Sequence, residues 1–311
     1  MSQNNTNIQH FVPVCYLRNF CPKEEQGKRN PKVWAYDKLS KRPDFKGVKS
    51  ICYINKLYSI NKKSESLITN NISDKETIFE SHFLHDFEQE YSPKLKEAIT
   101  SIEERRFGGQ QKIDISTFIA IQFLRDPILK ELCAGDEEIP YFVLPDEYKR
   151  LSNNSPELLD DPSMRHFMYA YGNKNAITPM VRSLSLSEWT IHYNINDVFF
   201  SSDNPVCLVQ DSPYKNKSTK LSILFPLSKN ILIQIRQGIQ INEIFFIDNT
   251  QQLQIDSFNF VQYFFAKKYV VSSTNTFDTI KDKITNYPIT WDINKLNIYG
   301  KTKYADHEHR G

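Results

Sequence analysis

The side chains that could act as nucleophiles or bind a metal ion are scattered along the chain, outside any standard catalytic motif. Ser201 and Ser202 do not lie in a Gly-x-Ser-x-Gly turn, the arrangement that exposes the nucleophile of many serine hydrolases. His82 and His85 are three residues apart and would share a helix face, but no His-Glu-x-x-His sequence accompanies them. We therefore expect no serine nucleophile here, and we expect both histidines on a solvated helix face.

Asp203 is the acid whose position most favours a functional role. It stands in Ser202-Asp203-Asn204-Pro205, between two segments that we predict to be strands. Many hydrolases place a base or a metal ligand at the end of a strand. Asp and Asn before a proline also form turns by bonding their own backbone. The sequence leaves both interpretations of Asp203 open.

Glycine, cysteine and charge content exclude several function classes. The chain has nine glycines and neither a Gly-x-Gly-x-x-Gly nor a P-loop sequence, so we expect no nucleotide cofactor. Its five cysteines contain no Cys-x-x-Cys pair, which argues against a disulfide framework and a zinc ribbon. A formal net charge of +2 excludes a strongly electrostatic nucleic-acid scaffold but leaves local basic surface open.

The overall composition is that of a folded protein outside the membrane. Hydrophobic residues make up 40% of the 311 residues and aromatic residues 13%, which is too much for a disordered chain. The segment 1–9 is polar, unlike a signal peptide, and no stretch approaches about 18 uninterrupted apolar residues. We expect a soluble, cytoplasmic protein without membrane contact.

Apolar periodicity predicts three helices in the first half. A capping-box pattern at Ser73 predicts a helix that continues to about residue 106 and ends at Gly108-Gly109. Further helices are predicted over 115–132 and 164–184, separated by a polar excursion at 134–162. The first helix carries an apolar stripe at near-helical spacing, formed by Phe79, Phe83, Phe87, Tyr91, Leu95 and Ile99.

The second half has the pattern of short strands bounded by turn residues. We predict a helix over 248–267 and expect an α+β fold, with a helical first half and an antiparallel sheet with flanking helices in the second. The chain is expected to form one unit over 1–311, which could subdivide into a mainly helical part, 9–185, and a sheet-containing part, 186–300. The predicted strands are 32–37, 189–193, 198–200, 206–209, 221–225, 230–235 and 269–272.

The opening of the chain carries a family pattern. His10-Phe11-Val12-Pro13-Val14-Cys15-Tyr16-Leu17 resembles the His-Tyr-Val-Pro-x-x-Tyr-Leu opening of a bacterial domain-of-unknown-function family, number 4238, with Phe11 in place of the usual tyrosine. Other similar segments follow in the same order, over roughly residues 9–272. They are 33–38, Glu80 with Glu88, Leu124-Arg125-Asp126-Pro127, Phe200-Ser201-Ser202-Asp203-Asn204-Pro205 and Phe225-Pro226-Leu227-Ser228.

The resemblance selects a set of polar residues but implies no established activity. If the fold gathers His10, Glu80, Glu88 and Asp203, one imidazole and three carboxylates would suit Mn²⁺ or Mg²⁺ better than Zn²⁺. Arg125, with Asn204 beside the acid, would then bind a phosphate. Such a site would support metal-assisted hydrolysis of a phosphodiester.

Each member of this set also has a structural interpretation. Glu80 and Glu88 are eight residues apart, about 12 Å along a helix, which is too far for one metal ion. Glu80 could instead form an ion pair with Arg125. His10 could hold a loop by backbone hydrogen bonds.

Two hypotheses follow. The first is an intracellular bacterial hydrolase of nucleic acid or nucleotides, with Asp203, His10 and Glu80 catalytic and Asp203, His10 and Glu88 available to a metal ion. Members of such families often lie near phage-defence or toxin-like genes, which suggests a defence or toxin effector. The second is a non-catalytic binding or regulatory module, in which the same residues form a buried network and segment 134–162 contacts a partner protein.

Overall fold

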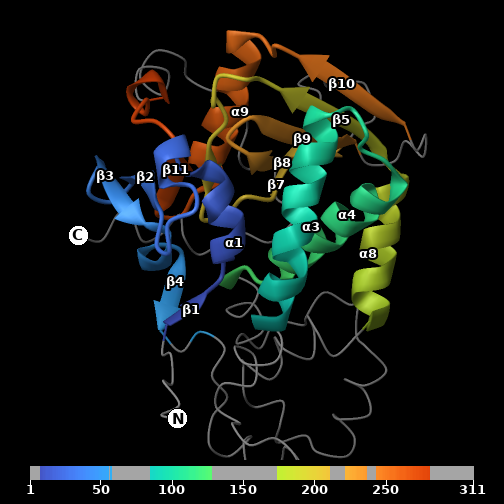
Figure 1. Cartoon of the computed structure of the whole chain (residues 1–311), viewed down its shortest axis with the longest axis horizontal. Coiled ribbons are helices and arrows are strands. Elements are labelled where there is room, and N and C mark those ends of the chain that lie inside the picture. The colour runs from blue at the N-terminus through green and yellow to red at the C-terminus, as the bar shows by residue number, and fades with distance from the viewer. Residues whose placement is uncertain are drawn as a thin grey trace, which may run out of the picture.

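The computed structural model describes residues 8–55, 57, 85–127, 174–210, 221–236 and 243–280. Several predicted features lie outside these residues: Glu80 and His82, the start of the first helix, the excursion at 134–162, and the beginning of the helix predicted over 164–184. Within the described part, helices and sheets combine into an α+β fold, as the sequence predicts (Figure 1).

The larger sheet has five strands in the order β10-β5-β9-β8-β7 (Figure 1). Neighbouring strands run antiparallel except at the edge, where β10 pairs in parallel with β5. The antiparallel sheet predicted for the second half is thus present, with one parallel pair added at its edge. The strands are β5 (Glu188–Tyr193), β7 (Cys207–Gln210), β8 (Leu221–Ser228), β9 (Ile231–Arg236) and β10 (Ile244–Asp248).

The smaller sheet joins segments from both ends of the chain. Its order is β3-β2-β11-β6, and all its pairs are antiparallel. The strands are β2 (Lys32–Asp37), β3 (Arg42–Gly47), β6 (Ser201–Ser202) and β11 (Tyr269–Ser272). A further pair joins β1 (Ile8–His10) to β4 (Tyr53–Asn55). Because β2 pairs with β11, the first and second halves of the chain share a sheet.

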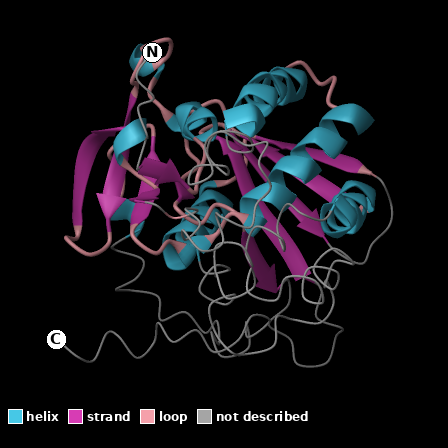
Figure 2. Ribbon diagram, turned by 90° about the horizontal axis from the view of Figure 1, so that it is seen from below, coloured by secondary structure: helices cyan, strands magenta, loops and turns pink. Residues whose placement is uncertain are grey.

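Helices cover both faces of the five-stranded sheet (Figures 1 and 2). Phe225 and Ile233 point to the face where α3 and α4 pack, whereas Leu224 and Leu232 point to α9. This alternation follows from the two-residue period of a strand. The described helices are α1 (Val14–Leu17), α3 (His85–Glu103), α4 (Gly109–Leu124), α8 (Lys174–Leu186) and α9 (Gln252–Phe265), with short 3-10 helices at Arg18–Phe20, Lys23–Glu25 and Val48–Ser50.

The predicted helix stop at Gly108-Gly109 is wrong. Helix α3 ends at Glu103, and Arg105 adopts the left-handed conformation with φ of 61°. Arg106 then donates its backbone N–H to Ser101, which closes a Schellman-type end without glycine. Gly108 instead precedes α4, where the side chain of Gln111 accepts its N–H, so α4 begins six residues earlier than predicted.

One strand prediction and one helix boundary also fail. Residues 198–200 form no strand, and β6 starts only at Ser201. The helix predicted over 248–267 is shorter because Asp248 ends β10. No described helix is both long and apolar enough to cross a membrane.

Candidate functional site

Asp203 lies at the end of β6 with both carboxylate oxygens bound to one loop. Oδ1 accepts the backbone N–H of Lys267 at 2.8 Å, and Oδ2 accepts those of Lys268 at 2.7 Å and Tyr269 at 3.0 Å. The residue is only 3% exposed. Burial raises the pKa of Asp203, while the three amide donors favour the charged form. The carboxylate thus joins β6 to the turn between α9 and β11, rather than closing the local turn that Asp-Asn-Pro suggests.

Amide side chains from α9 hold the segment that carries Asp203. Gln262 accepts a hydrogen bond from the Ser202 hydroxyl at 3.0 Å and donates to the Pro205 carbonyl at 3.2 Å. Asn259 similarly accepts the N–H of Phe200 at 2.8 Å. Asn204, expected to bind substrate, is half-buried and donates its side-chain amide to the Phe265 carbonyl at 3.5 Å. These bonds satisfy backbone groups that strand pairing leaves free.

Tyr16 connects three segments that carry family motifs. Its hydroxyl donates to the Pro226 carbonyl at 2.6 Å, so the Ser201 hydroxyl, 2.7 Å away, must donate to Tyr16. The ring is fully buried and stacks on Phe118 and Phe225. Ser201 therefore serves as a hydrogen-bond partner in the core, and burial raises the pKa of the Tyr16 hydroxyl well above its usual value.

His10, Glu88 and Arg125 lie around the short helix α1. Glu88 accepts the N–H of Val14 at 3.2 Å, at the first residue of the helix. Arg125, at the end of α4 and fully buried, donates to the His10 carbonyl at 2.6 Å and lies over the Phe87 ring. The structure thus brings these three predicted site residues to one place.

The His10 ring is a neutral imidazole in a defined tautomer. Its Nε2 lies 3.1 Å from the Lys49 carbonyl, which only accepts, so Nε2 carries the hydrogen. Burial lowers the pKa of His10 to about 4, and the charge on Arg125 acts in the same direction. This contact agrees with the interpretation that His10 holds a loop. Burial likewise raises the pKa of the nearby Cys15 thiol to about 12, so it is not an activated nucleophile.

The predicted metal ligands do not form a complete set in the described residues. There, no three His, Cys, Asp or Glu side chains are grouped as a metal site would require. Glu80 lies outside the described residues, so its predicted catalytic role and its predicted ion pair with Arg125 stay predictions.

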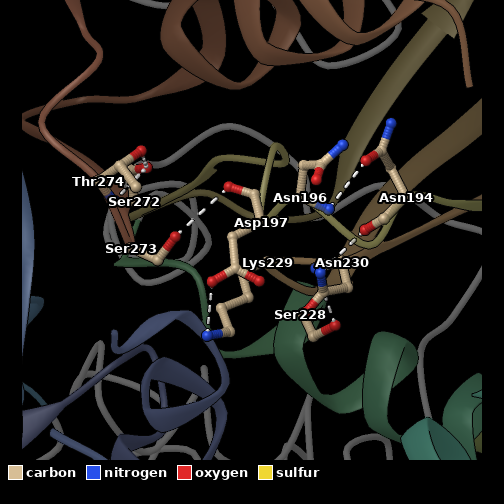
Figure 3. A network of polar contacts seen from close by, with 9 residues as sticks. All are labelled: Asn194, Asn196, Asp197, Ser228, Lys229, Asn230, Ser272, Ser273 and Thr274. Atoms are coloured by element: carbon tan, nitrogen blue, oxygen red, sulfur yellow. Dashed lines mark hydrogen bonds and ion pairs between the residues drawn. The ribbon is translucent and has the colours of Figure 1, made fainter. Parts of the chain in front are cut away.

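A second polar network lies where the β5–β6 loop, the β8–β9 turn and the segment after β11 meet (Figure 3). Lys229 forms an ion pair with Asp197 at 2.7 Å and is the least exposed cation among the described ion pairs, at 9% of its side chain. Ser273 donates its hydroxyl to the Asp197 carbonyl at 3.4 Å. The backbone N–H of Lys229 reaches the Asn19 carbonyl, just after the opening motif. This network ties both sheets to the start of the chain.

Sequence reasoning missed Gln262, Asn259 and the Lys229–Asp197 pair. The two amides had a detectable signal, because each interrupts the apolar run 258–265, where a buried polar residue needs a partner. Lys229 and Asp197 are far apart in the sequence, and nothing in either neighbourhood predicts their contact.

The fold and these contacts define an α+β protein whose motif residues meet in its interior. A family model described as Protein of unknown function (DUF4238) matches residues 8–276 of the 311-residue chain, so the protein belongs to that family. Searches of the curated proteins and of the solved structures found no match.

Proposed function

We propose that this protein is a non-catalytic binding or regulatory module, in which the motif residues hold the two halves of the chain together. The observation that carries the proposal is the set of three backbone N–H groups bound by Asp203. An ionised carboxylate has about four acceptor positions, so three amide bonds leave little capacity for a metal ion or a reacting proton. The hydroxyls of Tyr16 and Ser201 likewise serve to join segments of the fold by buried hydrogen bonds.

Replacing Asp203 tests this role. Asp203→Ala leaves three backbone N–H groups without their acceptor, and unsatisfied buried groups cost roughly 1–3 kcal/mol each. We expect urea unfolding to show a loss of about 3 kcal/mol or more, with a smaller loss in Asp203→Asn, which keeps one acceptor oxygen. Asp44→Ala is the control, because Asp44 is exposed, forms an ion pair with Lys46 at 3.2 Å and accepts one backbone N–H, that of its neighbour Phe45, at 2.8 Å.

An opposite result would favour the hydrolase. If Asp203→Ala kept the unfolding midpoint of the native protein while abolishing a metal-dependent cleavage of nucleic acid, Asp203 would be a site residue. The structural proposal would then be wrong.

The second candidate is the metal-dependent hydrolase of nucleic acid or nucleotides, with a role as a defence or toxin effector. It is favoured by the position of His10, Glu88 and Arg125 around one helix, where an imidazole, a carboxylate and a guanidinium lie together. A Mg²⁺ or Mn²⁺ ion that binds only the native protein must raise its stability. Thermal unfolding with EDTA, Mg²⁺ or Mn²⁺ therefore tests it: a shift that Glu88→Gln removes supports the site, and no shift with either ion argues against it.

The proposed setting is the cytoplasm. The described cysteines Cys15, Cys21, Cys52 and Cys207 are all free thiols, as a reducing compartment would keep them. We propose that the module binds a partner, which is either a protein or a nucleic acid.

A further inference from the structure

The β2–β3 hairpin carries an excess of positive charge that the whole chain does not share. The hairpin, residues 32–47, has five Lys and Arg residues against two Asp, a net charge of +3; with its flanks, residues 28–49, the net charge is +6, whereas the chain as a whole has +2. Of the flanking cations, Lys28 is paired with Glu25. Within the described residues, Arg29, Lys32, Lys41 and Arg42 lie in no ion pair. Such a local cluster of unpaired cations attracts a polyanion.

Aromatic rings accompany these cations on one face of the hairpin. Trp34 pairs with Phe45 across the strands, so both side chains point to the same side, and their ring centroids are 5.1 Å apart. Both rings are half-buried. Lys32, exposed and two residues before Trp34, lies on this side as well, with Nζ 5.8 Å from the Phe45 ring.

The opposite face of the hairpin is used by the core, which fixes the orientation of the rings. Val33 and Ala35 are fully buried in the main hydrophobic cluster. On the ring-bearing face, Tyr36 packs against Tyr263 and Phe277. Trp34 packs against the same cluster with part of its ring, and both it and Phe45 are half-exposed. The rings are therefore held by a rigid sheet.

A hydrogen-bonding group lies beside the rings. The carboxamide of Asn30 occupies the space that a Cβ at Gly47 would fill, with Nδ2 at 2.8 Å from that position. Gly47 pairs with Lys32, so this amide is on the ring-bearing face, and it makes no hydrogen bond to a described residue. Arg18 fixes the loop by donating to the Lys28 and Arg29 carbonyls. Asn30 is thus presented to solvent from a held loop.

We propose that this face binds single-stranded nucleic acid, with bases stacking on Trp34 and Phe45 and phosphates contacting Lys32 and Arg29. Unpaired bases expose the flat surfaces that aromatic rings bind, and stacking tolerates any sequence. The Asn30 amide can donate to and accept from a base edge. This proposal rests on the binding-module function proposed above, and it identifies single-stranded nucleic acid as the partner of that module.

Fluorescence anisotropy with a labelled oligothymidine of about 20 nucleotides tests the proposal at about 50 mM salt, where phosphate contacts are strong. Lys32→Glu should weaken binding about ten-fold or more, because it reverses a charge at the phosphate contact. Trp34→Leu should weaken it at least about five-fold and remove quenching of tryptophan fluorescence by the oligonucleotide. Lys96→Glu is the matched control: it changes the net charge equally on an exposed position of α3 and should change the affinity less than about two-fold.

Three results would overturn the proposal: no binding, equal weakening by Lys32→Glu and Lys96→Glu, or equally tight binding of a duplex of the same length. If Trp34→Leu fails to fold by circular dichroism, the comparison of Lys32→Glu with Lys96→Glu still decides. Unfolding of the Asp203 variants involves no nucleic acid, so a failure of this inference is distinct from a failure of the proposed function.

Discussion

Two histidines, the half-buried His10 and the buried His192, make the protein sensitive to acid at the scale of single residues. His10 has its pKa lowered to about 4 by burial; the hydrogen bond to the Lys49 carbonyl opposes this shift, and the charges of Arg125 and Lys49 add to it. His192, on β5, has its pKa lowered by burial and by Arg236. Its ring contacts Phe258, and its Nδ1 has no hydrogen-bond partner among the described residues. The fold therefore favours the neutral form of both rings, whereas a histidine in the unfolded chain becomes charged below about pH 6.5.

The sign of the resulting pH dependence follows from proton binding. Between about pH 6.5 and 4 the unfolded chain binds more protons than the native protein, so stability falls as the pH falls. We expect urea unfolding to show a loss of stability between about pH 7.5 and 5, of up to about 2 kcal/mol from His10 by linkage. His10→Gln keeps a donor for the Lys49 carbonyl without titrating, so it should flatten this dependence. An unchanged pH profile in that variant would show that His10 does not contribute.

At the scale of elements, one hydroxyl joins α1 to two strands. Tyr16 bonds Ser201 at the start of β6 and Pro226 in β8, while its ring packs in the aromatic cluster with Phe118. The opening motif thus reaches both sheets through a helix of only four residues. This explains physically why a tyrosine, and no other aromatic residue, fits this position: only its hydroxyl satisfies two buried oxygens.

Removing this hydroxyl measures its contribution. We expect Tyr16→Phe to reduce the free energy of unfolding by roughly 1–3 kcal/mol, because it leaves Pro226 and Ser201 with unsatisfied buried groups. Tyr53→Phe is the control, since Tyr53 is 37% exposed and should change stability by less than about 0.5 kcal/mol. In a double-mutant cycle, Tyr16→Phe and Ser201→Ala should be coupled by about 0.5–1.5 kcal/mol. Additive effects would contradict the proposed link.

At the scale of the whole molecule, the two halves of the chain complete one another. Strand β11 pairs with β2, and the main hydrophobic cluster contains Tyr16 and Phe118 together with Trp189 and Phe225. Because the two halves share a sheet and a hydrophobic core, neither half is stable until β2 has paired with β11 and the common core has formed.

Separating the halves tests the subdivision considered from the sequence. We expect fragment 186–300 to lack cooperative unfolding by itself, because its sheet loses the cover of α3 and α4 and β11 loses β2. Circular dichroism during heating measures this, and co-expression with fragment 1–185 should restore a folded complex. A sharp unfolding transition of 186–300 alone would instead show that it is an independent domain.

The sequence by itself determined the family, the α+β class and those strands whose side chains carry the signal locally. Strands β2, β5 and β11 were predictable because branched and aromatic residues are dense in them. Strand β3 was not, since Arg42–Gly47 is polar and contains a proline, and only its pairing with β2 makes it a strand.

The roles of the polar residues were decided by tertiary structure alone. The sequence left Asp203 open between a turn former and a site residue, whereas the amides it binds belong to Lys267, Lys268 and Tyr269, more than 60 positions away. Lys229 and Asp197, 32 positions apart in the sequence, are likewise brought together only by the fold. A carboxylate has the same chemistry wherever it stands, and what it does depends on which donors the folded chain brings to it.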